Sequence, residues 1–373
     1  MRRLACPALV ALALTSSALM AQTAPPATRA AKPAVPAKPW PDDDVLVARR
    51  DEAQTRKLFE DAAPLEFTLA ADFPAINRER TPNNATLFPA VLTVGGADMP
   101  VQLGSRGHLR LKETTCDFVP IRIVFSPERV AGTVFDGQTT LKLGTHCRDA
   151  ADFDQYVVRE YVSYQLTNLV TPMSFRARLA RATYVDARSK KPIGTHAALF
   201  LEHESDVARR LEGREVRQTH MAFADFDPNA LMTTMLLEYM LGNTDYSLSA
   251  LHNIVVVQNK ARHFFPLAYD FDSSGMVNAP YAAPDPRLFA VHSVTDRLYR
   301  GPCRGVDEVD AAAERFRARR ADMFAAIDTV PMLNGFHRRQ LKDYLDGFFR
   351  RIATPASIKS TFVDGCPATR KGI

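Results

Sequence analysis

The sequence lacks the long hydrophobic run that a membrane-spanning helix requires, because none of its apolar stretches reaches about 18 residues. It also lacks a strong excess of one charge: 47 Lys and Arg residues stand against 42 Asp and Glu residues, a net charge of +5 over 373 residues. Proteins that bind nucleic acids usually concentrate basic residues on one face. We therefore expect neither a membrane span in the mature chain nor a nucleic-acid partner.

Several catalytic signatures are absent as well. The sequence has no C-x-x-C pair, no H-E-x-x-H zinc motif, no G-x-S-x-G nucleophile elbow and no dense glycine-rich phosphate loop. The segments Glu202-His203-Glu204 and Ser273-Ser274-Gly275 have the wrong spacing for the zinc motif and the elbow. Glycosidases use two carboxylates, but these lie several ångströms apart on either side of a sugar. Zinc peptidase, serine hydrolase and glycosidase chemistry are therefore not favoured.

The composition is that of a globular protein, with 46% hydrophobic and 24% charged residues. Its length allows one large domain or two of modest size. Residues 1–21 begin with Arg2 and Arg3, continue with an apolar run and end in small residues, which is typical of a secretory signal peptide. We expect cleavage near Ala21 and export to the periplasm or the medium; a buried N-terminal helix is the alternative.

Cysteine usage agrees with export. Cys6 lies in the leader, so four cysteines remain in the mature chain, and an even number in an exported protein indicates two disulfides. Four cysteines permit three pairings. We favour Cys116–Cys147 with Cys303–Cys366, because each pair stays within one half of the chain; four free buried thiols are the alternative.

The first half of the mature chain is predicted to be rich in strands. Residues 22–63 are expected to be an Ala/Pro-rich linker and N-terminal segment, since the Ala/Pro-rich composition of residues 22–44 cannot bury a core. Short strand-like runs separated by Pro and Gly follow from residue 64. The predicted strands are Leu65–Ala70, Ala90–Val94, Val101–Leu103, His108–Lys112, Ile121–Phe125, Thr139–Leu143, Arg178–Val185 and Ala197–Glu202. Apolar residues at helical spacing predict one helix among them, over Asp154–Val170.

The second half is predicted to be mainly helical. Asp227 as N-cap, Pro228 at the first position and Gly242 after the last turn delimit one helix. The other predicted elements are short strands at Asn253–Gln258 and His263–Leu267 and amphipathic packing helices at Val306–Thr329 and Phe336–Ile352.

A cluster of polar residues between positions 241 and 278 carries the chemistry that we expect. Asp270 and Asp272 follow a short strand, and alternation along a strand would turn both to one side. With the amide oxygen of Asn253 they form a hard ligand set suited to Mg²⁺ or Mn²⁺. Such an ion, bridging phosphate oxygens, is central to phosphoryl transfer. Asp245, in a nearby loop, is placed to accept the proton of an attacking hydroxyl.

A triphosphate also needs cations. Lys142 lies on a predicted strand and Glu160 on the helix after it, so a lysine oriented by a helix glutamate is one hypothesis. The segment Gly104-Ser105-Arg106-Gly107 is a second source of donors, through its backbone N–H groups and the Arg106 side chain.

Each of these residues also has a purely structural interpretation. Aspartates commonly cap turns, a strand lysine or a helix glutamate is commonly solvated, and Asn253 could bond the loop backbone. His146, beside Cys147, and His252 are expected to pack rather than to act on a substrate.

The sequence of this chain resembles that of the CotH family of atypical secreted kinases, named for a spore-coat protein. The resemblance is clearest between Arg106 and Gly275. It is carried by Arg106-Gly107, Leu141-Lys142-Leu143, Arg159-Glu160, Leu199-Phe200-Leu201-Glu202, Gly242-Asn243-Thr244-Asp245 and Tyr269-Asp270-Phe271-Asp272. The chain is similar, over about three quarters of its length, to uncharacterised exported bacterial proteins that share strings such as LKLGTHC and YDFDSSGMVNAPYA.

The resemblance implies an α+β, two-lobed protein-kinase-like fold. A mainly antiparallel β N-lobe with one helix would span residues 64–203, a mainly helical C-lobe residues 204–360 and a tail residues 361–373. It further implies ATP with Mg²⁺ or Mn²⁺ and an unknown hydroxyl acceptor, either a protein or a small molecule.

The resemblance also implies roles for single residues. Lys142 would contact the phosphates, oriented by Glu160, and Glu202 would lie at the hinge near adenine. Asp245 would be the catalytic base, and Asn253 and Asp270 would bind the metal. The alternative function is a catalytically inactive pseudokinase or an exported binding or scaffold protein, motivated by the scarcity of ATP outside the cytoplasm. Oligomeric state is left open.

Overall fold

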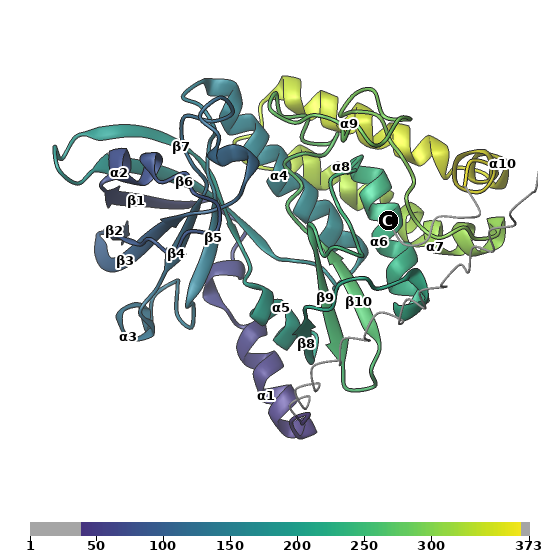
Figure 1. Cartoon of the computed structure of the whole chain (residues 1–373), viewed down its shortest axis with the longest axis horizontal. Helices are drawn as coiled ribbons and strands as arrows, with labels where there is room; N and C mark the ends of the chain where they lie inside the picture. The colour runs from purple at the N-terminus through teal and green to yellow at the C-terminus, as the bar shows by residue number, and fades with distance from the viewer. Residues whose placement is uncertain (1–38, 367–373) are drawn as a thin grey trace, which may run out of the picture. The chain divides into compact units, whose positions relative to one another are not determined.

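Seven strands in the first half of the chain close into a barrel in the computed structural model, which describes residues 39–366 (Figure 1). Around the barrel the order is β1-β2-β3-β4-β5-β7-β6. The strands are β1 (Leu65–Ala71), β2 (Phe88–Val94), β3 (Ala97–Ser105), β4 (Ile121–Val124), β5 (Thr140–Gly144), β6 (Ala177–Asp186) and β7 (Pro192–Leu201). Their side chains alternate between the barrel interior and its outside, as in β1, where Phe67, Leu69 and Ala71 are buried.

One parallel pairing closes the barrel. β1 pairs with β6 in parallel, from Leu65 opposite Ala180 to Ala71 opposite Asp186, whereas every other neighbouring pair of barrel strands is antiparallel. The chain passes from β5 to β6 through α4 (Ala151–Val170). Because closure pairs every strand on both sides, the barrel has no open edge.

A separate three-stranded antiparallel sheet lies in the second half, in the order β10-β9-β8. Its strands are β8 (Gly213–Val216), β9 (Ile254–Asn259) and β10 (Phe264–Ala268). The remaining α-helices of residues 39–366 are α1 (Asp43–Gln54), α2 (Phe73–Arg78), α3 (Pro127–Val130), α5 (Glu204–Arg210), α6 (Pro228–Leu241), α7 (Val306–Ala318), α8 (Arg320–Thr329), α9 (Gly335–Arg351) and α10 (Pro355–Ile358). In α6 the Asp227 side chain accepts a hydrogen bond from the amide of Ala230, and Gly242 ends the helix with φ +64°, as the sequence predicts.

The buried apolar side chains form two clusters that do not follow the predicted lobes. One fills the barrel and includes Leu69, Leu143 and Phe200. The other joins α4 and the outward side chains of β6 and β7, such as Leu179 and Leu199, to α6–α9 and to β9–β10. In Figure 1, α4 accordingly lies between the barrel and the helices of the second half.

The predicted two-lobed kinase-like fold is therefore wrong. The described residues form a closed seven-stranded mixed barrel with a separate three-stranded sheet and ten α-helices. The strands were expected in a mainly antiparallel N-lobe sheet, but the parallel β1–β6 pairing closes them on themselves. The core then continues from α4 and the outer faces of β6 and β7 into the second half without a boundary near residue 203.

Two predicted elements also differ locally. His108–Lys112 is a single 3₁₀ turn over Leu109–Leu111 rather than a strand, because the amides of Leu111 and Lys112 bond within the segment, to His108 and Leu109. The predicted helix Val306–Thr329 is broken at Arg319 into α7 and α8. Within the segment expected to link the leader to the fold, residues 43–54 form α1.

The predicted disulfides are confirmed: Cys116 bonds Cys147, and Cys303 bonds Cys366. Among residues 39–366 no helix has both the length and the apolar character to cross a membrane. The two disulfides are compatible with an exported protein. The predicted signal peptide, residues 1–21, lies outside the described residues.

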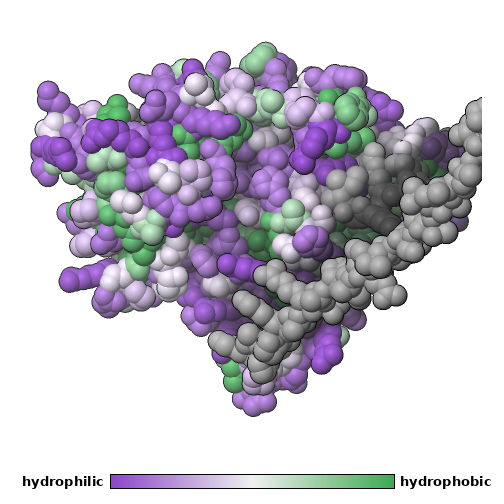
Figure 2. All heavy atoms as spheres, in the orientation of Figure 1, coloured by the Kyte–Doolittle hydropathy of each residue, from purple (hydrophilic) through white to green (hydrophobic). Residues whose placement is uncertain are grey.

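The surface is mostly polar on the face drawn in Figure 2, with hydrophobic residues scattered among hydrophilic ones. Scattered apolar residues are normal on a protein surface.

Candidate functional site

A cleft of about 720 Å³ gathers most of the residues that the sequence singled out. Its lining comes from the segment after β3, from β5, from the loop after α6 and from the loop after β10. The predicted site residues that line it are Arg106, Lys142, Asp245, Asn253, Asp270 and Asp272. Residues more than 150 positions apart in the sequence therefore face one space.

The turn after α6 holds Asp245 at the cleft. The Asp245 amide donates to Asn243 Oδ1 at 3.0 Å, and Asn253 Nδ2 donates to the Asp245 carbonyl at 2.7 Å and to its carboxylate at 3.3 Å. Asn253 adopts the left-handed conformation, with φ +52°, immediately before β9. Since its amide nitrogen serves Asp245, its amide oxygen remains for another partner. The carboxylate of Asp245 is half-exposed, with 49% of the side chain accessible.

His252 contacts this carboxylate instead of packing. Its Nε2 lies 2.9 Å from Asp245 Oδ1, and 55% of its side chain is accessible. The hydrogen bond to Asp245 raises the pKa of His252 above its usual 6.5, against the opposing effect of partial burial. The expectation that His252 packs was wrong. His146 is buried, as expected of a structural residue, and stacks on His196 at 3.6 Å between ring centroids.

Asp270 and Asp272 both line the cleft, with Phe271 buried between them. They follow β10 rather than belong to it, and Asp270 has φ +61°, with its amide donating to the Tyr164 hydroxyl at 2.9 Å. Asp272 accepts hydrogen bonds from Ser273 Oγ and the Tyr281 hydroxyl, each at 3.2 Å. Burial, and then the charge of Asp270, raise the pKa of Asp272 to about 6.

Glu160 lies next to these carboxylates and not on Lys142. Only 8% of Glu160 is accessible, and no hydrogen bond to its carboxylate occurs among residues 39–366. Burial, followed by the charges of Asp272 and Asp270, raises its pKa well above 4.5. Lys142 pairs instead with Glu204, Nζ to Oε1 at 2.5 Å, and lies 4.3 Å from the centre of the Tyr269 ring. The expected Lys142–Glu160 pairing is thus replaced by a pairing with the first residue of α5.

Glu202 does not line the cleft. Its side chain is fully buried at the end of β7, where Arg176 Nη2 and Arg210 Nη2 approach its two oxygens at 2.7 and 3.1 Å. The backbone amide of Arg176 donates to it as well, at 2.8 Å. These bonds tie β6, β7 and α5 together, so the contacts of Glu202 are those of a buried structural ion pair and not those of a hinge residue facing a ligand.

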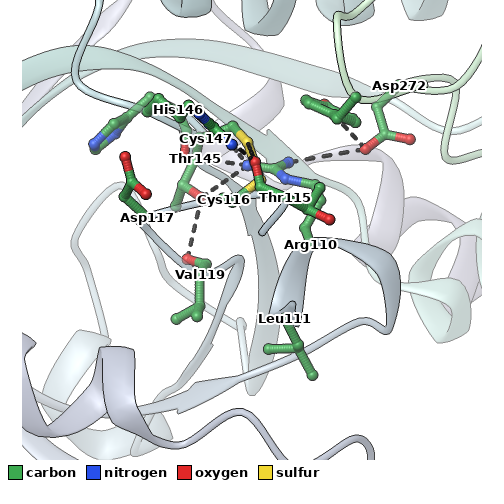
Figure 3. The surroundings of a disulfide bond; sticks show 12 residues. Arg110, Leu111, Thr115, Cys116, Asp117, Val119, Thr145, His146, Cys147 and Asp272 are labelled. Atoms are coloured by element: carbon green, nitrogen blue, oxygen red, sulfur yellow. Dashed lines mark hydrogen bonds and ion pairs between the residues drawn. A yellow bond between two sulfur atoms is a disulfide. The ribbon is translucent and has the colours of Figure 1, made fainter. Parts of the chain in front are cut away.

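Arg110 lines the cleft and was missed by the sequence analysis. Its Nη2 donates to the carbonyls of Thr145 and His146 at 2.6 and 3.2 Å, and its Nη1 lies 3.9 Å from Asp272 Oδ2. Figure 3 shows the guanidinium between these carbonyls and Asp272. Arg110 was not considered as a cleft residue because residues 108–112 were wrongly predicted to form a strand. The signal in the sequence that could have indicated it is a second arginine four residues after Arg106.

The Cys116–Cys147 disulfide lies beside this arginine (Figure 3). Cys147 directly follows the residues whose carbonyls accept from Arg110, and its own carbonyl accepts from the amides of Asp117 and Phe118. The disulfide therefore links the segment that follows Arg110 to the loop whose carbonyls accept hydrogen bonds from the Arg110 guanidinium.

We expect that replacing both Cys116 and Cys147 by serine lowers the free energy of unfolding by about 3–4 kcal/mol, the chain-entropy effect of a link across 31 residues. Urea unfolding followed by circular dichroism measures this change. The matched control is the oxidised wild type under the same buffer. An unchanged unfolding midpoint would contradict the assigned role of the link.

The donor set at the cleft fits a hard divalent cation in its chemistry. Carboxylates of Asp270 and Asp272 and a free amide oxygen of Asn253 are oxygen ligands, and the carboxylate of Glu160 is buried beside them without a hydrogen-bond donor in residues 39–366. Within this part of the chain, however, no three His, Cys, Asp or Glu side chains are already arranged to hold an ion. A cation would have to draw the side chains together, with an amide and phosphate oxygens completing its shell.

Comparison with known proteins adds little. No protein-family model matches the chain, and no curated protein sequence matches it significantly. Among solved structures, the crystal structure of the Helicobacter pylori proinflammatory kinase CtkA aligns with a TM-score of 0.35 and 12% sequence identity, covering 65% of this chain and 92% of that chain. This distant neighbour is a kinase, but membership of the CotH family is not shown.

Proposed function

We propose that the protein is a phosphotransferase that uses a divalent metal to move the γ-phosphate of ATP to a hydroxyl group. The observation that carries the proposal is the convergence of Lys142, Arg106 and Arg110 with Asp245, Asp270 and Asp272 on one cleft. Cations suit the phosphates, and oxygen ligands suit Mg²⁺ or Mn²⁺. A half-exposed carboxylate at the mouth suits an incoming hydroxyl.

The residues divide the work in the following way. Lys142 and Arg106 bind phosphate oxygens, and Lys142 is kept in place by Glu204. Asn253, Asp270 and Asp272 hold the metal, which neutralises developing phosphate charge when bound. Asp245 accepts the proton of the acceptor hydroxyl as its oxygen bonds to the γ-phosphorus. The bond from that phosphorus to the β–γ bridging oxygen breaks, and ADP leaves.

Export and the CotH relationship belong to the same proposal. The motifs that resemble the CotH family supply several cleft residues, among them Arg106, Lys142, Asp245 and Asp270. Both disulfides suit an oxidising compartment. The acceptor is a protein or small-molecule hydroxyl outside the cytoplasm.

A melting scan with millimolar Mg²⁺ and ATP tests the proposal. Ligands that bind only the folded state raise the midpoint, so we expect a higher midpoint with the pair than with either component alone. No shift would contradict the nucleotide assignment. A shift without transfer of radiolabelled phosphate to any hydroxyl would favour the pseudokinase or scaffold alternative.

Replacing Lys142 with methionine is expected to raise KM for ATP about tenfold or more, because a charge-assisted phosphate contact contributes about 1.5–3 kcal/mol. Steady-state kinetics at varied ATP measures it. Lys342→Met, which removes a partly exposed, ion-paired lysine on α9, is the matched control and is expected to leave KM unchanged. Equal KM values for ATP in both variants would contradict a role of Lys142 in binding phosphate.

His252 is expected to set the acid limb of the pH profile. Since the folded-state pKa of His252 is raised, its ion pair with Asp245 is present at low pH and is lost as the pH rises through that pKa. Protonated His252 forms an ion pair with the Asp245 carboxylate, which must accept the proton of the substrate. We therefore expect kcat/KM to fall as the pH drops through this value and expect His252→Gln to move the fall to lower pH. An unchanged acid limb in the variant would contradict this role.

A further inference from the structure

The turn that carries Asp245 is hydrogen-bonded, through Asn243, to a buried glutamate. We propose that Glu238, on the last turns of α6, is a positioning residue that holds this turn in its working geometry. The inference rests on the proposed role of Asp245 and adds a residue that does not line the cleft. It is carried by a continuous chain of hydrogen bonds.

One asparagine side chain makes the connection. Asn243 Nδ2 donates to Glu238 Oε2 at 2.9 Å, and Asn243 Oδ1 accepts from the Asp245 amide at 3.0 Å. The Asn243 backbone amide also donates to the Glu238 carbonyl at 2.8 Å. Asn243 is fully buried, so no water competes for either end of its side chain. The orientation of the Asn243 amide, and with it the Asp245 backbone, therefore follows from Glu238.

Glu238 is a costly residue for this position, which argues that it does more than pack. Only 1% of it is accessible, and its neighbours along α6 are buried apolar residues such as Leu237 and Tyr239. Its Oε1 has no hydrogen-bond partner within residues 39–366. An apolar side chain would fill the same space without that desolvation cost. An apolar side chain could not, however, accept the hydrogen bond from Asn243.

The charged groups around Glu238 indicate that it holds the turn in its neutral form. Burial raises the pKa of Glu238 to about 8; the hydrogen bond from Asn243 and the charge of Arg300 act against this rise, and the charge of Asp245 adds to it. Arg300 also contacts the turn, with Nη1 donating to the carbonyls of Thr244 and Tyr246 at 2.7 and 2.9 Å. Ionisation of Glu238 would attract that guanidinium away from the turn.

The experiment compares Glu238→Gln, Glu238→Leu, Asn243→Ala and the double variant Glu238→Leu/Asn243→Ala, with Glu314→Gln on exposed α7 as control. One readout is the pKa of His252 from proton NMR titration, which reports its contact with Asp245 and needs no catalysis. The other is kcat and KM as a function of pH.

We expect Glu238→Leu to return the pKa of His252 towards 6.5 and to lower kcat about tenfold or more with KM for ATP little changed, as misplacement of a reacting group does. Glu238→Gln keeps an acceptor for Asn243, so it should preserve the pKa of His252. Because glutamine does not ionise, this variant should also lack the fall in kcat that we expect in the wild type as Glu238 ionises near pH 8. The double variant should be no worse than either single one, because both break the same chain. Glu314→Gln should match the wild type.

The outcomes separate this inference from the proposed function. If Glu238→Leu, or Asn243→Ala in case the leucine variant does not fold, leaves both the pKa of His252 and kcat unchanged, the inference is overturned. If no form of the protein transfers phosphate but the pKa of His252 still falls in these variants, the proposed function fails while the positioning role of Glu238 stands. Additive losses in the double variant would also contradict the single chain of contacts.

Discussion

Replacing Asp270 with asparagine is expected to lower metal-dependent phosphate transfer by about 10³-fold, since a catalytic metal contributes several kcal/mol of transition-state stabilisation. Asp270 is the acidic residue of the cleft with the fewest competing partners: its backbone amide bonds Tyr164, while its carboxylate is offered to the cleft. The amide of asparagine keeps the size of the side chain but removes the charge that attracts the cation.

The fold should survive this change. Asp270 stands beside Asp272 and buried Glu160, whose pKa values it raises, so removing its charge relieves repulsion. We therefore expect an unchanged or higher melting temperature together with the loss of transfer, measured on the same preparation by calorimetry and by radiolabelled ATP. Asp310→Asn, on the exposed side of α7, is the control. Full turnover by Asp270→Asn would reject the metal role assigned to this residue.

Replacing Asp245 with asparagine is expected to lower kcat about 10²–10⁴-fold, the usual contribution of a positioned general base. Asparagine keeps one side-chain oxygen to accept from His252, and the backbone carbonyl at this position still accepts from Asn253, so the turn should stay in place. The binding of Mg²⁺ and ATP, which depends on other residues, should be nearly unchanged.

The distinguishing measurement for Asp245 is a kcat-against-KM split. A fall in kcat with a constant KM for ATP assigns Asp245 to the chemical step. A rise in KM with constant kcat would instead place the carboxylate in nucleotide binding. Asp285→Asn serves as the matched carboxylate control, because Asp285 also lines the cleft but its carboxylate is paired with Arg287 at 2.6 Å.

Local patterns in the sequence were enough to place most strands and helices. Capping by Asp227 and termination by Gly242 are properties of adjacent residues, which is why α6 is found within a residue of its predicted limits. The alternation of buried and accessible side chains along β1 is equally local. Their parallel pairing, with Leu65 opposite Ala180, joins segments more than 100 residues apart, and no local pattern encodes it. The predicted lobes failed at that point.

The sequence allowed us to name several of the residues that line the cleft, but not the partners that these residues contact. The acidic segment after β10 and the turn after α6 could be found because carboxylates cluster there in the sequence. The partner of Lys142 could not, because Glu160 and Glu204 both follow it and only the path of the chain decides between them. Arg110 escaped because the apolar alternation around it imitates a strand, while its backbone forms a 3₁₀ turn. Glu238 could not be identified because the sequence does not distinguish a buried helix glutamate from a solvated one.

A crystal soaked with Mn²⁺ and a non-hydrolysable ATP analogue, with anomalous scattering recorded at the manganese edge, tests the central claim most directly. The account predicts an anomalous peak within ligand distance of Asp270, with phosphate density between that peak and the Lys142 ammonium. An empty cleft at millimolar concentrations of both ligands, or a peak bound elsewhere with Lys142 still held by Glu204 alone, would contradict it.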